Sequence, residues 1–233
     1  MTATELLRQQ IITAQIPPGT LLNQSALAKT LGTSRVPVRD ALIRLAAQHL
    51  IELRDGVARV ARLSMPDLEE IYELREAIEP AATRIALPNV GRAEILQMEK
   101  LLELMGDTDE LGGWLTANRQ FHRLVYGQSN RVQTIGLIDS LAERTDRYLF
   151  HYVPALDDGL QRFDEQHQLI LDAARAGAGG EIEELTKLHL VTAHRMILGR
   201  MLDGTMQTGS HELSPRHRSE PLVQSNSDRR SRQ

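Results

Sequence analysis

Cysteine is absent from the 233-residue sequence, which excludes disulfide bonds and thiolate chemistry. Any metal site must therefore use histidine, carboxylate or amide ligands. Aromatic residues make up only 3% of the chain, so a folded core has to consist mainly of aliphatic side chains. No run of about 18 apolar residues occurs, and the N-terminus lacks the basic and apolar segments of a secretory signal. We therefore expect a cytoplasmic protein that does not span a membrane.

The net charge of −4 conceals an uneven distribution along the chain. Residues 1–62 carry eight cationic and four anionic side chains, a net charge of +4, which leaves −8 for the remaining 171 residues. A basic segment joined to a longer acidic one is typical of a protein in which only the first part contacts a polyanion. A basic surface that faces only solvent would produce the same asymmetry.

Residues 1–63 show the element order of a winged helix-turn-helix domain. Short helices are predicted at 4–13 and 27–31, and a third is predicted at about 35–47, with Ser34 as a capping residue and Pro37 in its first turn. Two β-prone runs, at 50–53 and 57–60, then flank an Asp-Gly pair, which is a strong hairpin signal.

The beginning of the third helix carries the residues that we expect to read DNA. In helix-turn-helix proteins this end of the recognition helix faces base edges in the major groove. Arg35 and Arg39 lie one helical turn apart and suit bidentate contacts to guanine. Two arginines alone would more simply face water, but the preceding helix and the following hairpin favour DNA binding. The predicted contacts are Ser34, Arg35, Val36, Pro37, Arg39, Arg44 and Gly56.

Residues 5–62 resemble, without a gap, the DNA-binding domain of the GntR family of bacterial regulators. Gln24, Thr33 and Asp40 stand where the family usually has an acidic residue, Val and Glu. The resemblance implies that Arg35 and Arg39 read guanines, and that a homodimer binds a short palindromic operator in double-stranded DNA. The matching residues are Ile12, Pro18-Gly19, Leu22, Leu27-Ala28, Leu31-Gly32, Ser34-Arg35, Pro37-Val38-Arg39, Ala41-Leu42, Leu45 and Gly56.

Residues 64–203 are predicted to form an all-α helical bundle, so that the protein as a whole is mainly α. Glycine- and proline-containing breaks separate the expected helices, which lie at about 64–87, 91–105, 109–127, 131–152, 160–176 and 180–202. Residues 204–233 are rich in polar residues and lack an apolar period. This composition predicts a disordered tail, with a partner-binding arm as the alternative.

Three histidines and an asparagine in the helical segment form a pattern typical of a metal site. His167 and His189 lie about equally far from the glycine-rich break near residue 178, so an antiparallel helical hairpin brings them to the same level. Both lie in apolar stripes, as do Asn118 and His122, which are one helical turn apart. Neutral imidazoles bind zinc, nickel, iron or manganese. Core histidines with ordinary hydrogen bonds are the alternative.

Residues 64–202 are similar to the FCD effector domain of the FadR-type GntR subfamily. Many such domains bind a divalent metal through Asp or Asn, a His four residues later, and two further His, a pattern that Asn118, His122, His167 and His189 match. The resemblance implies a divalent metal ion, with zinc as the first choice and nickel or manganese as alternatives. The subfamily often has Asp at the first position, and the neutral amide of Asn118 donates less charge to a metal.

Arg75 occupies a core position in the apolar stripe of the helix at 64–87, where a buried guanidinium needs a partner. An internal ion pair with a Glu or Asp on another helix would supply one. Alternatively, Arg75 binds the carboxylate of a small organic-acid effector, the class that the subfamily commonly senses. Arg144 is a second candidate for this effector-binding role.

The sequence thus predicts a homodimeric transcriptional regulator, not an enzyme, whose affinity for its operator is controlled by a small carboxylate effector bound in the metal-containing helical domain. A metal-dependent enzyme with an accessory DNA-binding domain is the alternative. No acid or base residue stands beside the histidines at a catalytic motif spacing to favour it. A purely structural core around the histidines is the third interpretation.

Overall fold

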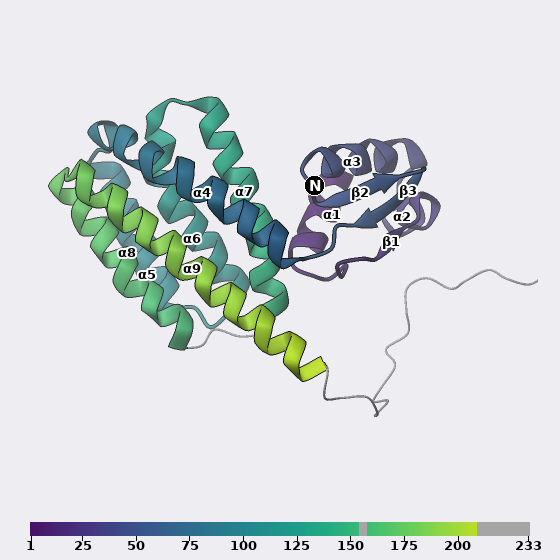
Figure 1. The fold of residues 1–233 in the computed structure, drawn as a ribbon. Coiled ribbons are helices and arrows are strands. Elements are labelled where there is room, and N and C mark those ends of the chain that lie inside the picture. The colour runs from purple at the N-terminus through teal and green to yellow at the C-terminus, as the bar shows by residue number, and fades with distance from the viewer. Residues whose placement is uncertain (154–157, 209–233) are drawn as a thin grey trace, which may run out of the picture.

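The computed structural model describes residues 1–153 and 158–208, which form a small N-terminal domain and a larger bundle of helices (Figure 1). The N-terminal domain combines three helices with a three-stranded antiparallel sheet of order β1-β3-β2. Its elements are α1 (Ala3–Ile12), β1 (Leu21–Leu22), α2 (Gln24–Thr30), α3 (Arg35–Ala47), β2 (Ile51–Arg54) and β3 (Val57–Val60). This is the predicted winged helix-turn-helix order.

Local sequence explains the ends of these elements. Asp55 and Gly56 form the two-residue loop between β2 and β3, and both have positive φ angles, 50° and 75°, as a type I′ hairpin turn requires. The helix α2 begins three residues earlier than predicted, because the side chain of Asn23 accepts hydrogen bonds from the first backbone N–H groups. The strand β1 was not predicted, since two residues carry no alternating pattern.

Within residues 64–153 and 158–208, the bundle consists of six long helices and two short 3-10 turns. Ser64 caps the first helix by accepting a hydrogen bond from the backbone N–H of Asp67. The elements are α4 (Met65–Ala86), η1 (Leu87–Asn89), α5 (Arg92–Asp107), α6 (Leu111–Tyr126), η2 (Gly127–Ser129), α7 (Val132–Tyr152), α8 (Asp158–Ala176) and α9 (Gly179–Thr208). The last helix extends to Thr208 rather than ending at 202, so the predicted tail begins inside it; residues 209–233 lie outside the described residues.

The helices α8 and α9 form an antiparallel hairpin whose turn contains Gly177 at a φ of +65°. The helix α4 packs along α9 and also contacts α6 and α7 (Figure 1). Aliphatic side chains and a few aromatic ones fill the space between the helices, and among the largest are Tyr72, Phe121 and Tyr148. None of the described helices is long and apolar enough to cross a membrane.

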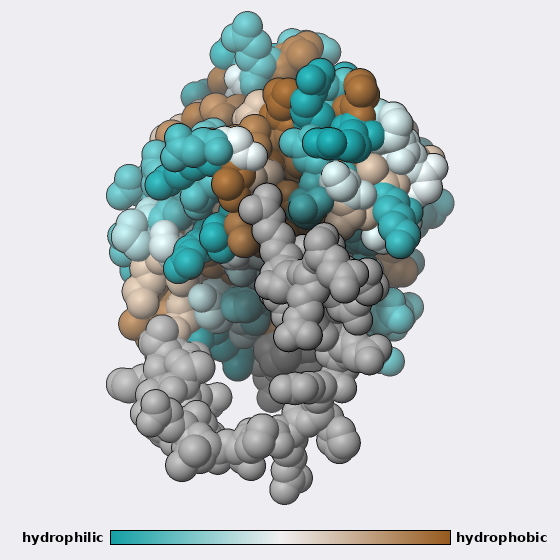
Figure 2. Space-filling view, turned by 90° about the vertical axis from the view of Figure 1, so that its right-hand side faces the viewer, coloured by the Kyte–Doolittle hydropathy of each residue, from teal (hydrophilic) through white to brown (hydrophobic). Residues whose placement is uncertain are grey.

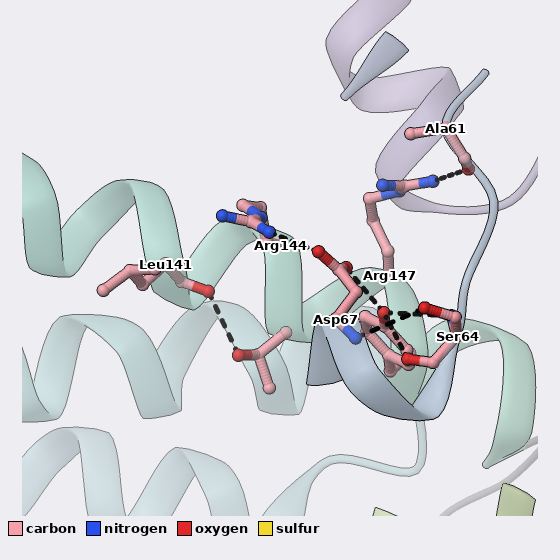
Figure 3. A network of polar contacts seen from close by, with 8 residues as sticks. Ala61, Ser64, Asp67, Leu141, Arg144 and Arg147 are labelled. Atoms are coloured by element: carbon pink, nitrogen blue, oxygen red, sulfur yellow. Dashed lines mark hydrogen bonds and ion pairs between the residues drawn. The ribbon is translucent and has the colours of Figure 1, made fainter. Parts of the chain in front are cut away.

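Polar contacts from α7 connect the bundle to the segment between the two domains (Figure 3). Arg147 is buried and donates a hydrogen bond to the backbone oxygen of Ala61. The hydroxyl of Tyr148 lies 2.7 Å from Asp67 Oδ2 and 3.1 Å from the backbone oxygen of Ser64. These contacts hold the segment between the domains and the start of α4 against α7. The two domains are therefore connected by polar contacts as well as by the continuous backbone.

A second contact between the domains starts from α1. Arg8 Nη1 lies 3.4 Å from Glu143 Oε1 of α7, and Arg8 Nη2 donates to Gln48 Oε1 at 2.9 Å. Gln48 is the C-terminal cap of α3. One arginine therefore contacts both the end of the predicted recognition helix and the bundle.

Candidate functional site

The three histidines of the predicted metal pattern meet in the interior of the bundle. His122 comes from α6, His167 from α8 and His189 from α9. Their ring centroids lie 4.7 to 5.1 Å apart, and one nitrogen of each ring lies within 4.8 Å of the other two. The hairpin argument from the sequence thus predicted the approach of His167 and His189 correctly.

Hydrogen bonding orients one of these rings. His189 Nδ1 lies 3.1 Å from Gln166 Oε1, so an N–H at this position leaves Nε2 as a free lone pair toward the other rings. His122 Nε2 and His167 Nε2 lie 3.2 Å apart. Among the described residues, His167 Nδ1 has no hydrogen-bond partner.

Burial keeps the three imidazoles neutral. Loss of solvation lowers the pKa of His122 to about 3, and the positive charge of Arg75 adds to this effect. The pKa values of His167 and His189 are also well below the ordinary value, first because of burial and then because of the neighbouring histidines. Neutral imidazoles with exposed lone pairs are the form that binds a metal ion.

Asn118 lies one turn before His122 on α6 and lines the same cavity. Its Oδ1 is buried and accepts no hydrogen bond from any of the described residues. A buried amide oxygen without a donor is costly, and it is also a competent ligand for a divalent cation. The donor set of three imidazole nitrogens and one amide oxygen therefore fits such an ion.

A small cavity opens beside the histidines, between α4, α6, α7 and α9. Its volume is about 50 Å³ for the centres of water molecules, which is room for about three to five of them. His122 and His189 line it, together with Arg75 and Glu79 of α4 and Asp146 of α7.

Arg75 has the internal partner that its position demands. Its Nε lies 2.6 Å from Glu79 Oε1, its Nη2 lies 3.4 Å from Glu79 Oε2, and its Nη1 donates to Thr145 Oγ1 at 3.2 Å. A guanidinium has five N–H donors, so two remain. The sequence left open an ion pair or a ligand contact, and the structure establishes the ion pair while keeping Arg75 at the cavity wall.

Sequence reasoning missed Asp146, whose carboxylate lines the cavity. Burial raises its pKa to about 7, while the nearby positive charge of Arg119 acts in the opposite direction. Arg119 Nη1 lies 2.9 Å from Asp146 Oδ2. One signal was available, because Ile138, Ala142, Asp146 and Leu149 follow helical spacing on α7 and all of them line the cavity.

The predicted DNA-reading residues are all exposed on the N-terminal domain. Val38 between them points into the core and is fully buried, which fixes the rotation of α3 so that Arg35 and Arg39 face outward. Figure 2 views the molecule from the side of this domain and shows hydrophilic side chains interleaved with smaller hydrophobic patches. Ser34 stands at the N-cap of α3 without a side-chain capping bond, so its hydroxyl remains available to a ligand.

Comparison with known proteins agrees with both parts of this architecture. The description "Bacterial regulatory proteins, gntR family" matches residues 2–60, and "FCD domain" matches residues 70–192, which is more than half of the chain. The chain belongs to the GntR family. Both family matches identify this protein as a DNA-binding transcriptional regulator with a helical FCD domain.

Curated relatives of this GntR-family regulator are named as regulators of transcription. The chain is 28% identical over 175 residues to the HTH-type transcriptional regulator McbR of Escherichia coli K12, covering 73% of this chain and 79% of the relative. It is 31% identical over 190 residues to a probable D-xylose utilization operon transcriptional repressor of Paenarthrobacter nicotinovorans, covering 79% and 82%. Both relatives are named as regulators of transcription, and neither name supports the alternative of a metal-dependent enzyme.

A solved structure shows the same fold. The structure titled E. coli McbR/YncC superposes with a TM-score of 0.76 and covers 85% of this chain and 96% of its own, at 22% sequence identity. The likeness at this identity concerns the fold, which is the winged helix-turn-helix followed by the FCD bundle.

Arg144 does not reach the cavity in this GntR-family regulator. Its Nη2 lies 2.6 Å from Asp67 Oδ1 (Figure 3), and it is not one of the residues that line the cavity. The reason is rotation about α7: Thr145 and Asp146 face the cavity, whereas Arg144 faces the start of α4. The structure thus gives Arg144 a structural ion pair between α7 and α4 and does not support the predicted contact with an effector.

Proposed function

We propose that this regulator is a homodimer that binds a short palindromic operator, and that its affinity for the operator changes when a small carboxylate occupies the helical domain. The exposed positions of Arg35 and Arg39 at the start of α3 support base contacts, and the exposed Arg44 in its last turn supports a phosphate contact. Ser34, Val36, Pro37 and the hairpin tip at Gly56 complete the proposed DNA surface. Since its target is DNA, we place the regulator in the cytoplasm.

The metal site of this proposal consists of Asn118, His122, His167 and His189. The observation that carries it is the convergence, within 4.8 Å, of one nitrogen from each of three imidazoles, two of them buried and that of His122 half-buried. Zinc is the first choice, with nickel and manganese as alternatives. When bound, such an ion supplies a Lewis acid that attracts an anionic oxygen.

The effector is proposed to lie in the cavity beside the histidines. Arg75 supports this placement, because its guanidinium lines the cavity and keeps two N–H donors after pairing with Glu79 and Thr145. The size of the cavity favours a molecule of a few carbon atoms. A carboxylate group pairs with the guanidinium of Arg75 and is also attracted to a cation that the histidines would bind.

Effector binding in the bundle changes DNA binding because α7 both lines the cavity and contacts the segment between the two domains. Thr145 and Asp146 of α7 line the cavity, while Arg147 contacts the interdomain segment. A ligand that shifts α7 therefore changes how the N-terminal domain sits, and with it the spacing of two recognition helices in a dimer. By reciprocity, operator DNA must change the affinity for the effector by the same factor.

Elemental analysis of the untagged protein by mass spectrometry tests the core of this proposal. We expect about one divalent metal per chain, lost in His122→Ala and His189→Ala and retained in His151→Ala, whose histidine is exposed at the end of α7. The same variants are then compared for binding to an operator selected from random-sequence DNA. A wild-type protein that takes up no zinc, nickel or manganese would refute the metal site and leave the DNA-binding proposal standing.

A further inference from the structure

Arg119 of α6 lies where three hollows of the protein meet. It lines the buried cavity beside the histidines. It also lines a crevice of about 440 Å³ between α1 and the bundle, and a groove of about 250 Å³ along α6 and α7. Among the described residues, no other lines all three of these hollows. One side chain therefore separates the buried cavity from both the crevice and the groove.

An ion pair holds Arg119 at this boundary. Its Nη1 lies 2.9 Å from Asp146 Oδ2 on α7, and Asp146 is its only acidic partner in the part of the chain that the structure describes. The side chain of Asp146 is 5% exposed, whereas that of Arg119 is 34% exposed. The guanidinium thus reaches from a buried carboxylate toward the surface, and the contact joins α6 to α7 at the wall of the cavity.

Arg119 is less firmly held than the other arginine that contacts an acid at the cavity wall. Arg75 contacts both carboxylate oxygens of Glu79 and the hydroxyl of Thr145. A partly exposed ion pair such as that of Arg119 contributes little stability, so its guanidinium can turn outward and remain hydrated. A buried carboxylate that loses its partner is costly, so the closed arrangement is favoured. These are the properties of a gate that is normally shut.

Other parts of the cavity wall are less suited to open. Tyr126 and Ala142 also separate the cavity from the groove, but both are buried among packed helices. Ala193 and Met196 of α9 line the cavity and are half-buried, but they line neither the crevice nor the groove. A turn of the Arg119 side chain, by contrast, requires no separation of the helices.

We propose that Arg119 is the gate of the buried cavity: when its side chain turns away from Asp146, a route to the surface opens between α6 and α7. The mouth of this route lies beside the N-terminal domain, because α1 supplies one wall of the crevice and its Arg8 pairs there with Glu143. Small molecules and ions that enter the cavity therefore pass next to the DNA-binding domain. The inference concerns access to the cavity and depends on neither the metal nor the effector of the proposed function.

Quenching of tryptophan fluorescence by acrylamide tests this gate on the full-length protein. Trp114 is the only tryptophan of the chain, is 4% exposed, and lines the cavity but neither the crevice nor the groove. Asp146→Asn preserves the shape of the side chain but removes the ion pair. We expect its quenching constant to be about two- to five-fold above that of the wild type, the change in open population that loss of a partly exposed ion pair allows. Measurements with and without a chelator make the result independent of any bound metal.

A second ion pair between the same two helices supplies the matched control. Arg123 lies one turn after Arg119 on α6, pairs with Asp139 of α7, and lines the groove but not the cavity. Asp139→Asn should therefore leave the quenching of Trp114 unchanged. Arg119→Lys, which keeps the positive charge, should remain close to the wild type.

Two further variants distinguish a gate from general loosening of the bundle. Arg119→Ala and Asp146→Asn remove the same ion pair, so the double variant should be no more accessible than Arg119→Ala alone, whereas independent effects would multiply. Thr116 lines both the crevice and the groove but not the cavity. Adding Thr116→Phe to the Asp146→Asn protein should narrow the mouth of the route and slow the quenching. Circular dichroism and thermal melting check that each variant is folded.

Four results would overturn the gate. They are wild-type quenching in the Asp146→Asn protein, an equal rise in the Asp139→Asn protein, multiplied effects in the double variant, and no effect of Thr116→Phe. None of these results bears on the proposed metal site or on the DNA-binding surface, which elemental analysis and DNA titrations test separately.

Discussion

His122 Nε2 of α6 lies 3.2 Å from His167 Nε2 of α8. Two neutral imidazoles at this distance share a single proton, because one nitrogen donates and the other accepts. The third ring, His189, is held with its Nδ1 on Gln166. A divalent ion can take the place of that shared proton, since each ring then presents a lone pair to it.

The amide at position 118 sets how strongly that ion is held. We expect Asn118→Asp to bind zinc about ten-fold more tightly, because the carboxylate adds a negative charge to the ligands. Without metal, the same variant should melt at a lower temperature than the wild type, since the new carboxylate is buried beside neutral imidazoles. Thermal melting with zinc and with a chelator measures both effects. Asn130→Asp, at an exposed position with positive φ, is the control; an equal response there would contradict this account.

The metal-free protein should lose stability on acidification. Burial lowers the pKa of His122 to about 3 and holds those of His167 and His189 well below their usual value near 6.5. Their stabilisation is complete above about pH 6.5 and is lost as the pH falls further, because the unfolded chain takes up protons that the folded chain does not.

Asp146 acts in the opposite direction over part of this range. Burial raises its pKa to about 7, so its contribution is complete below about pH 4 and is lost as the pH rises through 7. With three protons opposed by one, we expect the free energy of unfolding to fall by about 3 kcal/mol per pH unit between roughly pH 6 and 4.5. Denaturant titrations at several pH values measure this slope. His122→Leu should lessen it and His151→Leu should not; a flat profile would contradict the buried, neutral histidines.

Specific DNA binding should depend on Arg39. We expect Arg39→Ala to abolish selective binding to the operator, with a loss of about 1–3 kcal/mol for each base contact removed, while the helical content stays the same. Arg44→Ala should instead weaken binding to all sequences and lower the salt slope by about one. Fluorescence anisotropy with specific and scrambled DNA distinguishes the two. Arg92→Ala, exposed at the start of α5, is the control. Full-strength selective binding by Arg39→Ala would contradict the assignment of Arg39 to base recognition.

Arg147 should hold the two domains together. Its substitution by Ala leaves the backbone oxygen of Ala61 without its donor, and we expect a loss of about 1–3 kcal/mol of stability. Amide hydrogen exchange should accelerate at residues 61–64 more than inside α3. Arg131→Ala, exposed at the start of α7, is the matched control. Unchanged exchange at 61–64 in the Arg147 variant would mean that the other contacts of Figure 3 suffice.

Local signals in the sequence were enough to predict the long helices, the hairpin of β2 and β3, and the histidine cluster, but not the short strand β1. The bounds of α3 agree with the prediction at both ends, because Ser34, Pro37 and the apolar stripe all indicate the same helix. The approach of His167 to His189 followed from counting residues on either side of one turn. Within a single helix or hairpin, the spacing along the chain sets the geometry directly.

Contacts that cross several helices could not be predicted in this way. Arg144 and Asp146 are two residues apart on α7, yet the first pairs with Asp67 and the second faces the cavity. Their directions depend on how α7 is rotated against α4, which the packing of the whole bundle decides. The ion pair of Arg75 could have been predicted from the sequence. Its partner Glu79 lies four residues later on the same helix, and side chains at this spacing are neighbours.

The contact of Arg8 with Glu143 has a consequence for measurements of DNA binding. Both side chains are partly exposed, 31% and 26%, so dissolved ions weaken their attraction. Raising the salt concentration therefore does two things: it lowers the gain from counterions released by the DNA, and it loosens α1 and the end of α3 from the bundle. The steepness of the salt dependence contains both contributions. The slope of a Glu143→Gln protein, which lacks this ion pair, gives the number of phosphates that the regulator neutralises, and its difference from the wild-type slope gives the contribution of the Arg8 contact.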